Sequence, residues 1–172
     1  VITMKAIKMG KHVYCEKPLA HSIYEVRKVT EAAREAGIAT QLGNQGQASE
    51  SNRLVCEFIW SDAIGPVRQI HSWCNRAISP RGIDRPKETP PVPEWLDWDL
   101  WLGPMKTRPY HSSLCHFVWR GWKDFGTGAV GDMGAHIIDH PYWALKLKYP
   151  ATIQASSTKL NKDSYPIASM VT

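Results

Sequence analysis

The sequence has no run of apolar residues long enough to cross a bilayer as a helix. It also lacks a secretory signal, because Val1-Ile2-Thr3 leads directly into a helix-like stretch. Its 21 lysines and arginines outnumber 16 acidic residues, but they are scattered and form no basic stripe of the kind that nucleic acid requires. We therefore expect neither a membrane span nor a nucleic-acid partner. A cytoplasmic location is favoured; periplasmic export stays open, since we expect the start of a longer protein to precede Val1.

Cysteine is scarce, and its spacing argues against a zinc knuckle. The four cysteines, Cys15, Cys56, Cys74 and Cys115, are far apart and form no C-x-x-C pair. Each lies in an apolar or aromatic stretch, which predicts a small buried side chain with a reduced thiol. Reduced thiols weakly favour a reducing compartment.

The N-terminal part alternates between helix and strand patterns. A helix is predicted over Ile2–Met9, a strand over 12–15, a second helix from a capping box at Ser22 to about Ala36, and a second strand over 38–43. This rhythm is typical of a parallel α/β sheet, in which ligands bind beyond the carboxyl ends of the strands. The loops that follow the two strands, Glu16–Pro18 and Asn44–Gly46, are therefore expected at the binding edge.

Beyond a boundary placed near Gly46 the pattern changes. We predict a helix over 49–61 with an apolar face, a strand over 67–76, an irregular proline-rich crossing over 80–93 and a short aromatic helix within 93–104. An irregular tryptophan-rich stretch, a helix over about 130–147 and two final strands follow. The chain thus combines the end of a Rossmann-type parallel sheet (1–46) with a truncated α+β domain (47–172), an open, mainly antiparallel sheet with flanking helices.

The stretch GDMGAHIIDH carries the densest group of titratable residues. Asp132 and His136 are four residues apart, so a helix places them on one face, and Asp139 and His140 continue that face. Pro141 must kink or restart the helix, and Asp139 could cap the restarted segment. The Asp132–His136 pair could stabilise the helix, form a tuned general base or contribute to a metal site with His140. Because no other residues complete a ligand set, no metal is predicted.

Two further features suggest a ligand site. Lys17 lies in a tight turn before Pro18, which would fix its direction if the peptide bond were cis. Most of the eight tryptophans lie between Trp95 and Trp122, and most are expected in the core because of their size. Trp119 and Trp122 are the candidates for stacking on a sugar, since Arg120 between them can bind hydroxyls or phosphate.

Taken together, GKHVYCEKPLA, then GNQ, then GDMGAHIIDH resemble the Gfo/Idh/MocA family of nicotinamide-dependent oxidoreductases. The glutamate-lysine-proline turn and an aspartate four residues before a histidine are the two signature elements of that family. The resemblance implies that Lys17 hydrogen-bonds the reacting hydroxyl and that His136 takes its proton as hydride leaves. It also implies that Asp132 holds the substrate or orients the imidazole.

The resemblance further implies an enzyme that uses NAD or NADP, with Glu16, Lys17, Pro18, Asn44 and Gln45 lining the cofactor. The expected reaction is hydride transfer between nicotinamide and a sugar, cyclitol or related polyol. A redox-neutral lyase or hydrolase of the same family and a non-catalytic sugar-binding subunit remain the alternatives.

One family element is missing. The G-x-G-x-x-G fingerprint that seats the pyrophosphate is absent, so we expect these 172 residues alone to bind dinucleotide poorly and to be inactive. His140 departs from the pattern and is expected at the pocket edge beside the substrate. Relatives also suggest homo-oligomers that pair through the C-terminal sheet.

Overall fold

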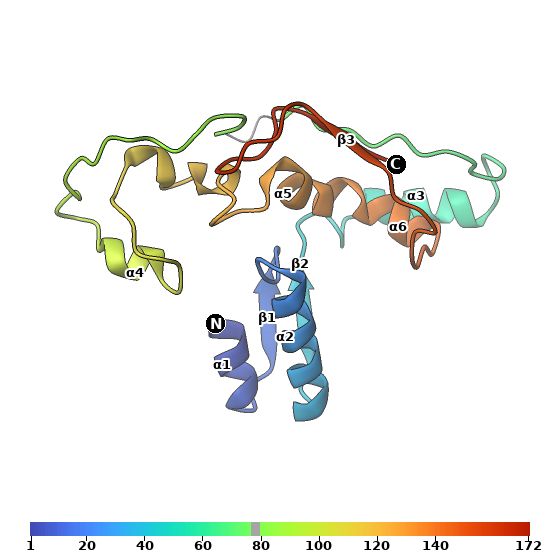
Figure 1. Cartoon of the computed structure of the whole chain (residues 1–172). Helices are drawn as coiled ribbons and strands as arrows, with labels where there is room; N and C mark the ends of the chain where they lie inside the picture. Colours follow the sequence, from blue (N-terminus) through green and yellow to red (C-terminus); the bar gives the residue numbers. More distant parts are fainter. Residues whose placement is uncertain (77–79) are drawn as a thin grey trace. The chain divides into compact units, whose positions relative to one another are not determined.

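The computed structural model describes residues 1–76 and 80–172, which form two compact units (Figure 1). The first unit comprises Val1–Cys74 and Met133–Lys148, and the second comprises Asn75–Asp132 and Tyr149–Thr172. The division falls inside one helix, between Asp132 and Met133. It differs from the sequence boundary near Gly46, which remains a prediction.

The first unit begins with the predicted α/β rhythm. Helix α1 (Ile2–Lys8) precedes strand β1 (Val13–Glu16), and helix α2 (Ile23–Ala36) precedes strand β2 (Thr40–Gly43). The two strands are parallel, with Val13 opposite Thr40 and Glu16 opposite Gly43. Each strand therefore ends at the same edge, where the loops 16–18 and 44–46 begin. The predicted fold class, a Rossmann-type parallel sheet followed by a smaller antiparallel one, is confirmed.

Helix α2 begins and ends with the signals that the sequence carries. The Ser22 hydroxyl accepts a hydrogen bond from the Glu25 N–H at 3.2 Å, and the Glu25 carboxylate accepts one from the Ser22 N–H at 2.9 Å. At the other end, Gly37 adopts a left-handed φ of 61°, which glycine tolerates without strain. The predicted capping box and stop are both confirmed. The side-chain hydrogen bond from Ser22 lowers the pKa of Glu25.

Replacing Ser22 by alanine is expected to destabilise the protein by about 1 kcal/mol, because it leaves an N–H at the start of α2 unpaired. Ser22→Thr keeps the hydroxyl and should cost less. Chemical denaturation above the pKa of free glutamate measures the difference, which should shrink as the pH falls through the lowered pKa of Glu25 and its carboxylate is protonated. Equal stability of Ser22→Ala and the parent would contradict the capping role.

Helix α3 (Glu50–Trp60) packs against α6 (Asp139–Ala144) in the first unit. The Trp60 indole donates a hydrogen bond to the Ala144 carbonyl at 2.7 Å and meets Trp143 edge to face at 6.4 Å between ring centroids. These contacts join a segment near the middle of the chain to one much closer to its end.

The prediction for the buried face of α3 is wrong. Its predicted apolar face consists of Leu54, Val55, Phe58 and Ile59; the first three are 43%, 46% and 57% exposed, and Ile59 is partly buried. The buried residues of this helix are Asn52 and Cys56, which lie four residues apart on another side. The helix is oriented by its contact with α6, and hydrophobic periodicity alone does not identify the partner.

The helix predicted over 130–147 is interrupted. Helix α5 (Gly128–Ile137) ends one residue before Ile138, and α6 restarts at Asp139. Pro141 lies in the first turn of α6, where proline is tolerated because the first N–H groups of a helix have no partner within that helix. The predicted restart is thus confirmed, but Asp139 does not cap it: Ile138 holds the cap position, without a side-chain hydrogen bond.

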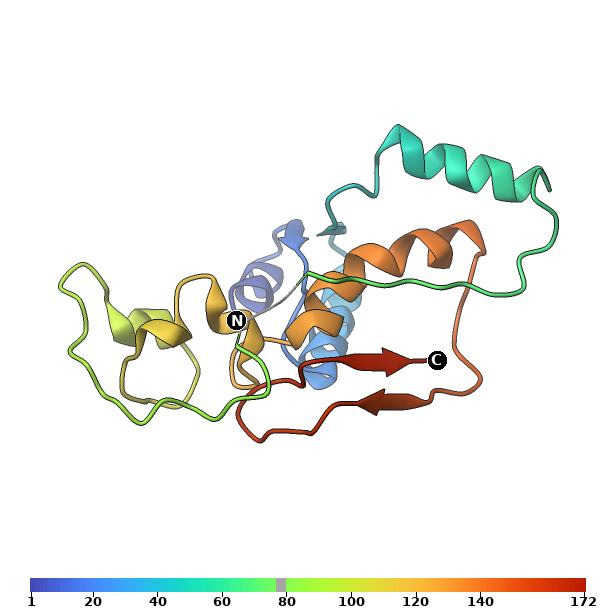
Figure 2. The same ribbon diagram turned by 90° about the horizontal axis from the view of Figure 1, so that it is seen from above.

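The second unit carries the short antiparallel pair β3 (Ala155–Ser157) and β4 (Ser169–Val171), which run side by side in Figure 2. This unit also carries helix α4 (Trp98–Leu102), two 3-10 turns, η1 (Ser112–Leu114) and η2 (Val118–Gly121), and the first residues of α5. The proline-rich crossing is irregular, as predicted. The strand predicted over 67–76 is wrong, because these residues pair with no other strand in the described part of the chain.

The core of the second unit is centred on Trp122, which is 1% exposed. Its indole N–H donates to the Ser113 carbonyl at 2.6 Å, and its backbone pairs with Ser164. Ser164 is itself fully buried and exchanges hydrogen bonds with the backbone of Ile83 at 2.7 and 2.9 Å. These bonds hold the proline-rich crossing against the C-terminal segment.

A group of four charged side chains reinforces this core. Asp124 lies 2.5 Å from both Arg85 and Arg108, and Arg85 also lies 3.3 Å from Asp163. Two guanidinium groups thus balance two carboxylates, so the group is neutral overall. Arg108 also covers the Phe125 ring at 4.9 Å.

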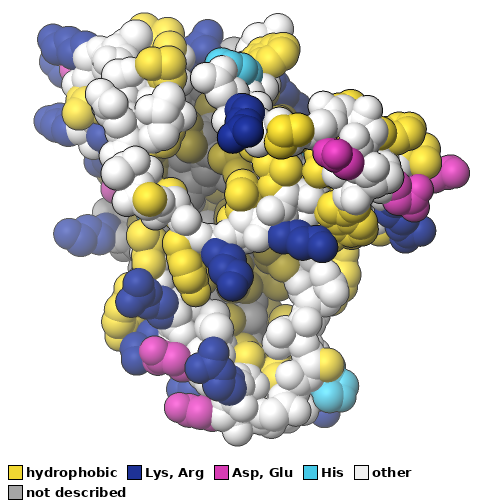
Figure 3. All heavy atoms as spheres, turned by 90° about the vertical axis from the view of Figure 1, so that its right-hand side faces the viewer, with side chains coloured by type: hydrophobic (Ala, Val, Ile, Leu, Met, Phe, Trp, Pro, Cys, Tyr) yellow, Lys and Arg dark blue, Asp and Glu magenta, His cyan; other side chains and the backbone are white. Residues whose placement is uncertain are grey.

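Many large hydrophobic side chains remain at the surface, as the yellow groups in Figure 3 show. They include Trp73 and Tyr149, at 80% and 92% exposure. Every residue of β3 and β4 is exposed as well, and pairing of copies through this sheet remains a prediction. Among the described residues, no helix combines the length and the apolar character that a membrane span requires.

Candidate functional site

The first part of the candidate site is the turn that follows β1. The backbone N–H of Lys17 donates to the Gly43 carbonyl at 2.9 Å, which extends the pairing with β2 by one residue. The Lys17–Pro18 peptide bond is cis, as the sequence suggested. Gln45 joins the second loop to the first by donating to the Glu16 carboxylate at 2.6 Å. The predicted cofactor-binding residues are therefore brought together at the carboxyl edge of the sheet.

The second part is a contact that the sequence did not reveal. The side-chain N–H of Asn44 donates to the Ala135 carbonyl in α5 at 2.9 Å. Ala135 directly precedes His136, so two hydrogen bonds and two pairs of adjacent residues, Gly43–Asn44 and Ala135–His136, connect Lys17 to His136. The position of Asn44 after a strand marked it as a candidate binding residue. Nothing in the sequence indicated that its side chain would bond a backbone carbonyl 91 residues away.

Lys17, His136 and His140 all lie in the first compact unit, and all three side chains are partly buried. The sequence predicted that Lys17 and His136 come from two folding units, whereas the structure assigns both to one. The hydrogen-bonded connection through Asn44 supports their proximity. That both side chains reach the same atom of a substrate stays a prediction.

Asp132 lies in the second unit, on the turn of α5 before His136. Its carboxylate is 3.8 Å from the Arg120 side chain. The Arg120 guanidinium also covers the rings of Phe117 and Trp119, at 4.2 and 4.8 Å, and donates to the Phe117 carbonyl at 2.9 Å. Arg120 is thus held by aromatic faces beside a carboxylate.

The structure does not support stacking of a substrate on Trp122. That ring is a core side chain, and its N–H is already bonded to Ser113. The physical reason is size, the same reason that predicted a core role for most tryptophans in this chain. Trp119 is partly buried and keeps its predicted role as a hypothesis.

Gly126 shows how tightly the Arg120 segment packs. A Cβ atom at this position would lie 2.2 Å from the Arg120 carbonyl oxygen and 2.5 Å from its Cα, both backbone atoms. Gly128 is similarly close to the Tyr165 ring and has a φ of 65°. The absence of a side chain at these two glycines therefore permits approaches that a larger residue would block.

The cysteines follow the prediction only in part. Cys56 and Cys115 are buried free thiols and Cys15 is a half-buried one, but Cys74 is exposed on the segment that was expected to form a strand. Burial raises the pKa of the Cys115 thiol, as it does that of the Tyr165 phenol. Within residues 1–76 and 80–172, no three His, Cys, Asp or Glu side chains group closely enough to hold a metal ion.

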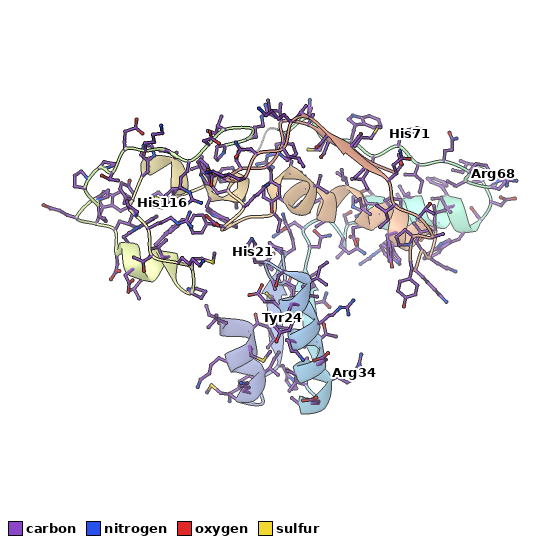
Figure 4. All side chains as sticks on the ribbon, in the orientation of Figure 1. His21, Tyr24, Arg34, Arg68, His71 and His116 are labelled. Atoms are coloured by element: carbon purple, nitrogen blue, oxygen red, sulfur yellow. The ribbon has the colours of Figure 1, made fainter. Side chains whose placement is uncertain are left out.

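A cavity of about 320 Å³ lies elsewhere in the first unit, between α1, α2 and one face of the sheet. Its lining is mainly aliphatic, with Cys15 and Arg34 among the exceptions; Arg34 is labelled on α2 in Figure 4. None of the predicted site residues lines it, so it is separate from the candidate site.

The loops that follow β1 and β2 lie at the carboxyl edge of a parallel sheet, the edge at which doubly wound α/β folds bind ligands. Residues 1–44 match the model of an oxidoreductase family's NAD-binding Rossmann fold, and residues 82–168 match that of its C-terminal alpha/beta domain. The chain belongs to this family, Gfo/Idh/MocA, and carries part of its NAD-binding domain.

Two curated relatives act on sugar derivatives, according to their names. The chain is 38% identical over 63 residues to 1,5-anhydro-D-fructose reductase of Ensifer adhaerens, a match that covers 37% of this chain and 19% of the relative. It is 27% identical over 139 residues to levoglucosan dehydrogenase of Pseudarthrobacter phenanthrenivorans, covering 80% and 28%. The chain thus spans less than a third of the length of either relative.

Two solved structures share the fold. GenD2 from gentamicin A biosynthesis, crystallised with NAD, superposes with a TM-score of 0.57 at 18% identity, covering 99% of this chain and 39% of that one. An NAD-binding oxidoreductase from Klebsiella pneumoniae gives 0.52 at 23% identity, covering 92% and 34%. At these identities the likeness concerns the fold alone.

The polar groups at the sheet edge fit a nicotinamide dinucleotide. Asn44 Oδ1 is buried and has no hydrogen-bond partner among the described residues. Such an acceptor is rarely left unpaired in a folded protein, and the carboxamide and ribose groups of a dinucleotide carry N–H and O–H donors. The exposed Glu16 carboxylate adds a second acceptor on the same edge.

Proposed function

We propose that the protein containing this chain transfers hydride between a nicotinamide cofactor, NAD or NADP, and a CH–OH group of a sugar, cyclitol or related polyol. The observation that carries the proposal is the connection from Lys17 through Gly43 and Asn44 to the residue before His136. This connection supports the placement of a cationic group and an imidazole near the edge where a parallel sheet binds ligands.

His136 is the general base in this proposal. A carbinol can release hydride only if its hydroxyl proton leaves too, and a neutral imidazole accepts that proton at a ring nitrogen. Lys17 binds the same oxygen, where its positive charge stabilises the developing alkoxide. The nicotinamide, when bound, accepts the hydride from the adjacent carbon.

The remaining predicted residues bind and orient. Glu16, Pro18, Asn44 and Gln45 line the cofactor together with Lys17. Asp132, beside Arg120, holds the substrate or orients the imidazole, and the 3.8 Å separation supports a shared polar surface for hydroxyl groups. Trp119 and His140 are the candidates for contacts with the sugar ring.

The substrate class is supported by the names of the curated relatives, a reductase of anhydrofructose and a dehydrogenase of levoglucosan. Both names refer to anhydro sugars, which present secondary hydroxyls on a compact ring. The test is to supply the intact protein with NAD or NADP and a panel of anhydro sugars, aldoses and cyclitols.

A dehydrogenase changes the absorbance of reduced nicotinamide in proportion to the product formed. A redox-neutral lyase or hydrolase would form product without a net change, and a sugar-binding subunit would form none. Either of these results, with a substrate that binds, would overturn the proposed reaction.

A further inference from the structure

The carbonyl groups at the end of α5 need donors from outside the helix. The last four carbonyls of an α-helix have no partner within it, and Ala135 is among the final residues of α5 (Gly128–Ile137). The residue four positions after Ile137 is Pro141, which has no N–H to donate to the Ile137 carbonyl. Asn44 supplies one from a distant loop, with its side chain 2.9 Å from the Ala135 carbonyl.

The chemistry of the amide fixes which atom faces the helix. A carbonyl only accepts hydrogen bonds, so Nδ2 of Asn44 must point to Ala135 and Oδ1 must point elsewhere. Oδ1 is nevertheless shielded from solvent, and it has no partner in the part of the chain that the structure describes. One half of the amide is therefore satisfied by the protein, whereas the other half is an unused buried acceptor.

We infer that Asn44 is a positioning residue: its amide N–H holds the end of α5, and hence His136, against the Lys17 loop, while its amide oxygen accepts a hydrogen bond from a bound ligand that carries an N–H or O–H group. This inference rests on the proposed function. It adds a role for Asn44 beyond lining the cofactor, because one side chain couples ligand binding to the placement of the base.

The coupling follows from the covalent sequence on both sides. Gly43, which accepts the Lys17 N–H, is directly bonded to Asn44, and Ala135 is directly bonded to His136. A shift of the Asn44 side chain therefore moves the base relative to the lysine. Displacement of a catalytic group by about 1 Å can lower a rate by about 10²-fold.

Three variants of the intact protein separate the two halves of the amide. Asn44→Asp keeps an acceptor oxygen but removes the donor to Ala135, and Asn44→Ala removes both groups. Gln41→Glu is the matched control, because Gln41 is an exposed amide on β2 whose side chain donates to the neighbouring Leu42 carbonyl. Steady-state kinetics with the nicotinamide cofactor give kcat and KM for each variant.

Asn44→Asp is expected to lower kcat by up to about 10²-fold with a smaller change in cofactor KM. Asn44→Ala should lower kcat similarly and also raise KM, whereas Gln41→Glu should match the parent. An unchanged kcat in both Asn44 variants would overturn the positioning role, and an equal KM in Asn44→Ala and Asn44→Asp would overturn the ligand contact. If Asn44→Asp fails to fold, Asn44→Leu, which is similar in size and carries neither donor nor acceptor, is compared with Asn44→Gln, which retains both; an equal kcat in the two would overturn the positioning role.

Hydrogen exchange distinguishes this inference from the proposed function. Loss of the Asn44 donor should speed amide exchange at the end of α5, whether or not the protein turns over any substrate. A parent protein without nicotinamide-dependent turnover would defeat the proposed function. Unchanged exchange in folded Asn44→Asp would defeat the positioning role by itself.

Discussion

Replacing His136 by asparagine is expected to lower kcat of the intact protein by about 10²–10⁴-fold, the usual contribution of a positioned general base. The imidazole is the group that we assign to take the hydroxyl proton, and asparagine cannot accept it at neutral pH. Because the side chain is only partly buried, the folded structure should persist. Lys17→Met should reduce kcat as well, since it removes the positive charge at the developing alkoxide.

His71→Asn is the matched control. His71 is exposed on the extended segment that follows α3, where it is labelled in Figure 4, and none of the proposed steps uses it. It should keep the parent's kcat, and the melting temperatures of all variants should be similar. Turnover by folded His136→Asn within about twofold of the parent would remove His136 from the mechanism and, with it, the proposed proton transfer.

The largest effect on stability is expected at Trp122. Truncating a buried tryptophan to alanine typically costs about 3–5 kcal/mol, through lost burial and the cavity that remains. Trp122 is 1% exposed, and its removal also leaves the Ser113 carbonyl without its donor. Trp122→Ala should therefore unfold the second unit at a markedly lower denaturant concentration, as followed by tryptophan fluorescence and circular dichroism.

Trp73→Ala provides the comparison, because its ring is 80% exposed. Exposed substitutions of this kind usually change stability by about 0.5 kcal/mol or less. A Trp122→Ala protein of normal stability and raised sugar KM would reinstate the stacking role that the sequence suggested. Loss of stability with an unchanged KM in the remaining folded protein would exclude that role.

The first two helices and strands could be predicted because their signals are local. Ser22 and Glu25 specify the start of α2 within one turn, and Gly37 specifies its end with a backbone conformation that other residues rarely adopt. The order of helix and strand then determines that the strands are parallel, which places the loops after β1 and β2 at one edge. The same reasoning predicted the site at that edge.

Two segments were predicted wrongly, because their structure depends on contacts with residues far away in the sequence. Residues 67–76 have the alternation of a strand, but a strand is stable only when its backbone groups pair with a neighbour. The exposed face of α3 is a similar case, since its apolar residues predict burial without identifying the surface that would cover them. In both cases the apolar pattern is present in the sequence, but among the described residues no strand pairs with 67–76 and the apolar face of α3 stays largely exposed.

The sequence predicted which residues belong to the candidate site, but not the hydrogen bonds that join them. Lys17, Asn44 and His136 were all chosen as candidates, from the turn after β1, the loop after β2 and the four-residue spacing of Asp132 and His136. The bond from Asn44 to Ala135 could not be foreseen, since a backbone carbonyl carries no sequence signature. Trp122 and Trp119 are the same residue type in the same stretch, so the sequence could not show that Trp122 is buried in the core and Trp119 only partly buried.

The contact of Gly126 with the Arg120 backbone limits how this part of the molecule can evolve. Any side chain at position 126 would overlap main-chain atoms, and no change of rotamer relieves a clash with backbone. Under the proposed function, the Trp119 and Arg120 side chains can change to suit another substrate, while the loop that carries them keeps its path. Position 126 is therefore expected to stay glycine while the side chains at neighbouring positions vary.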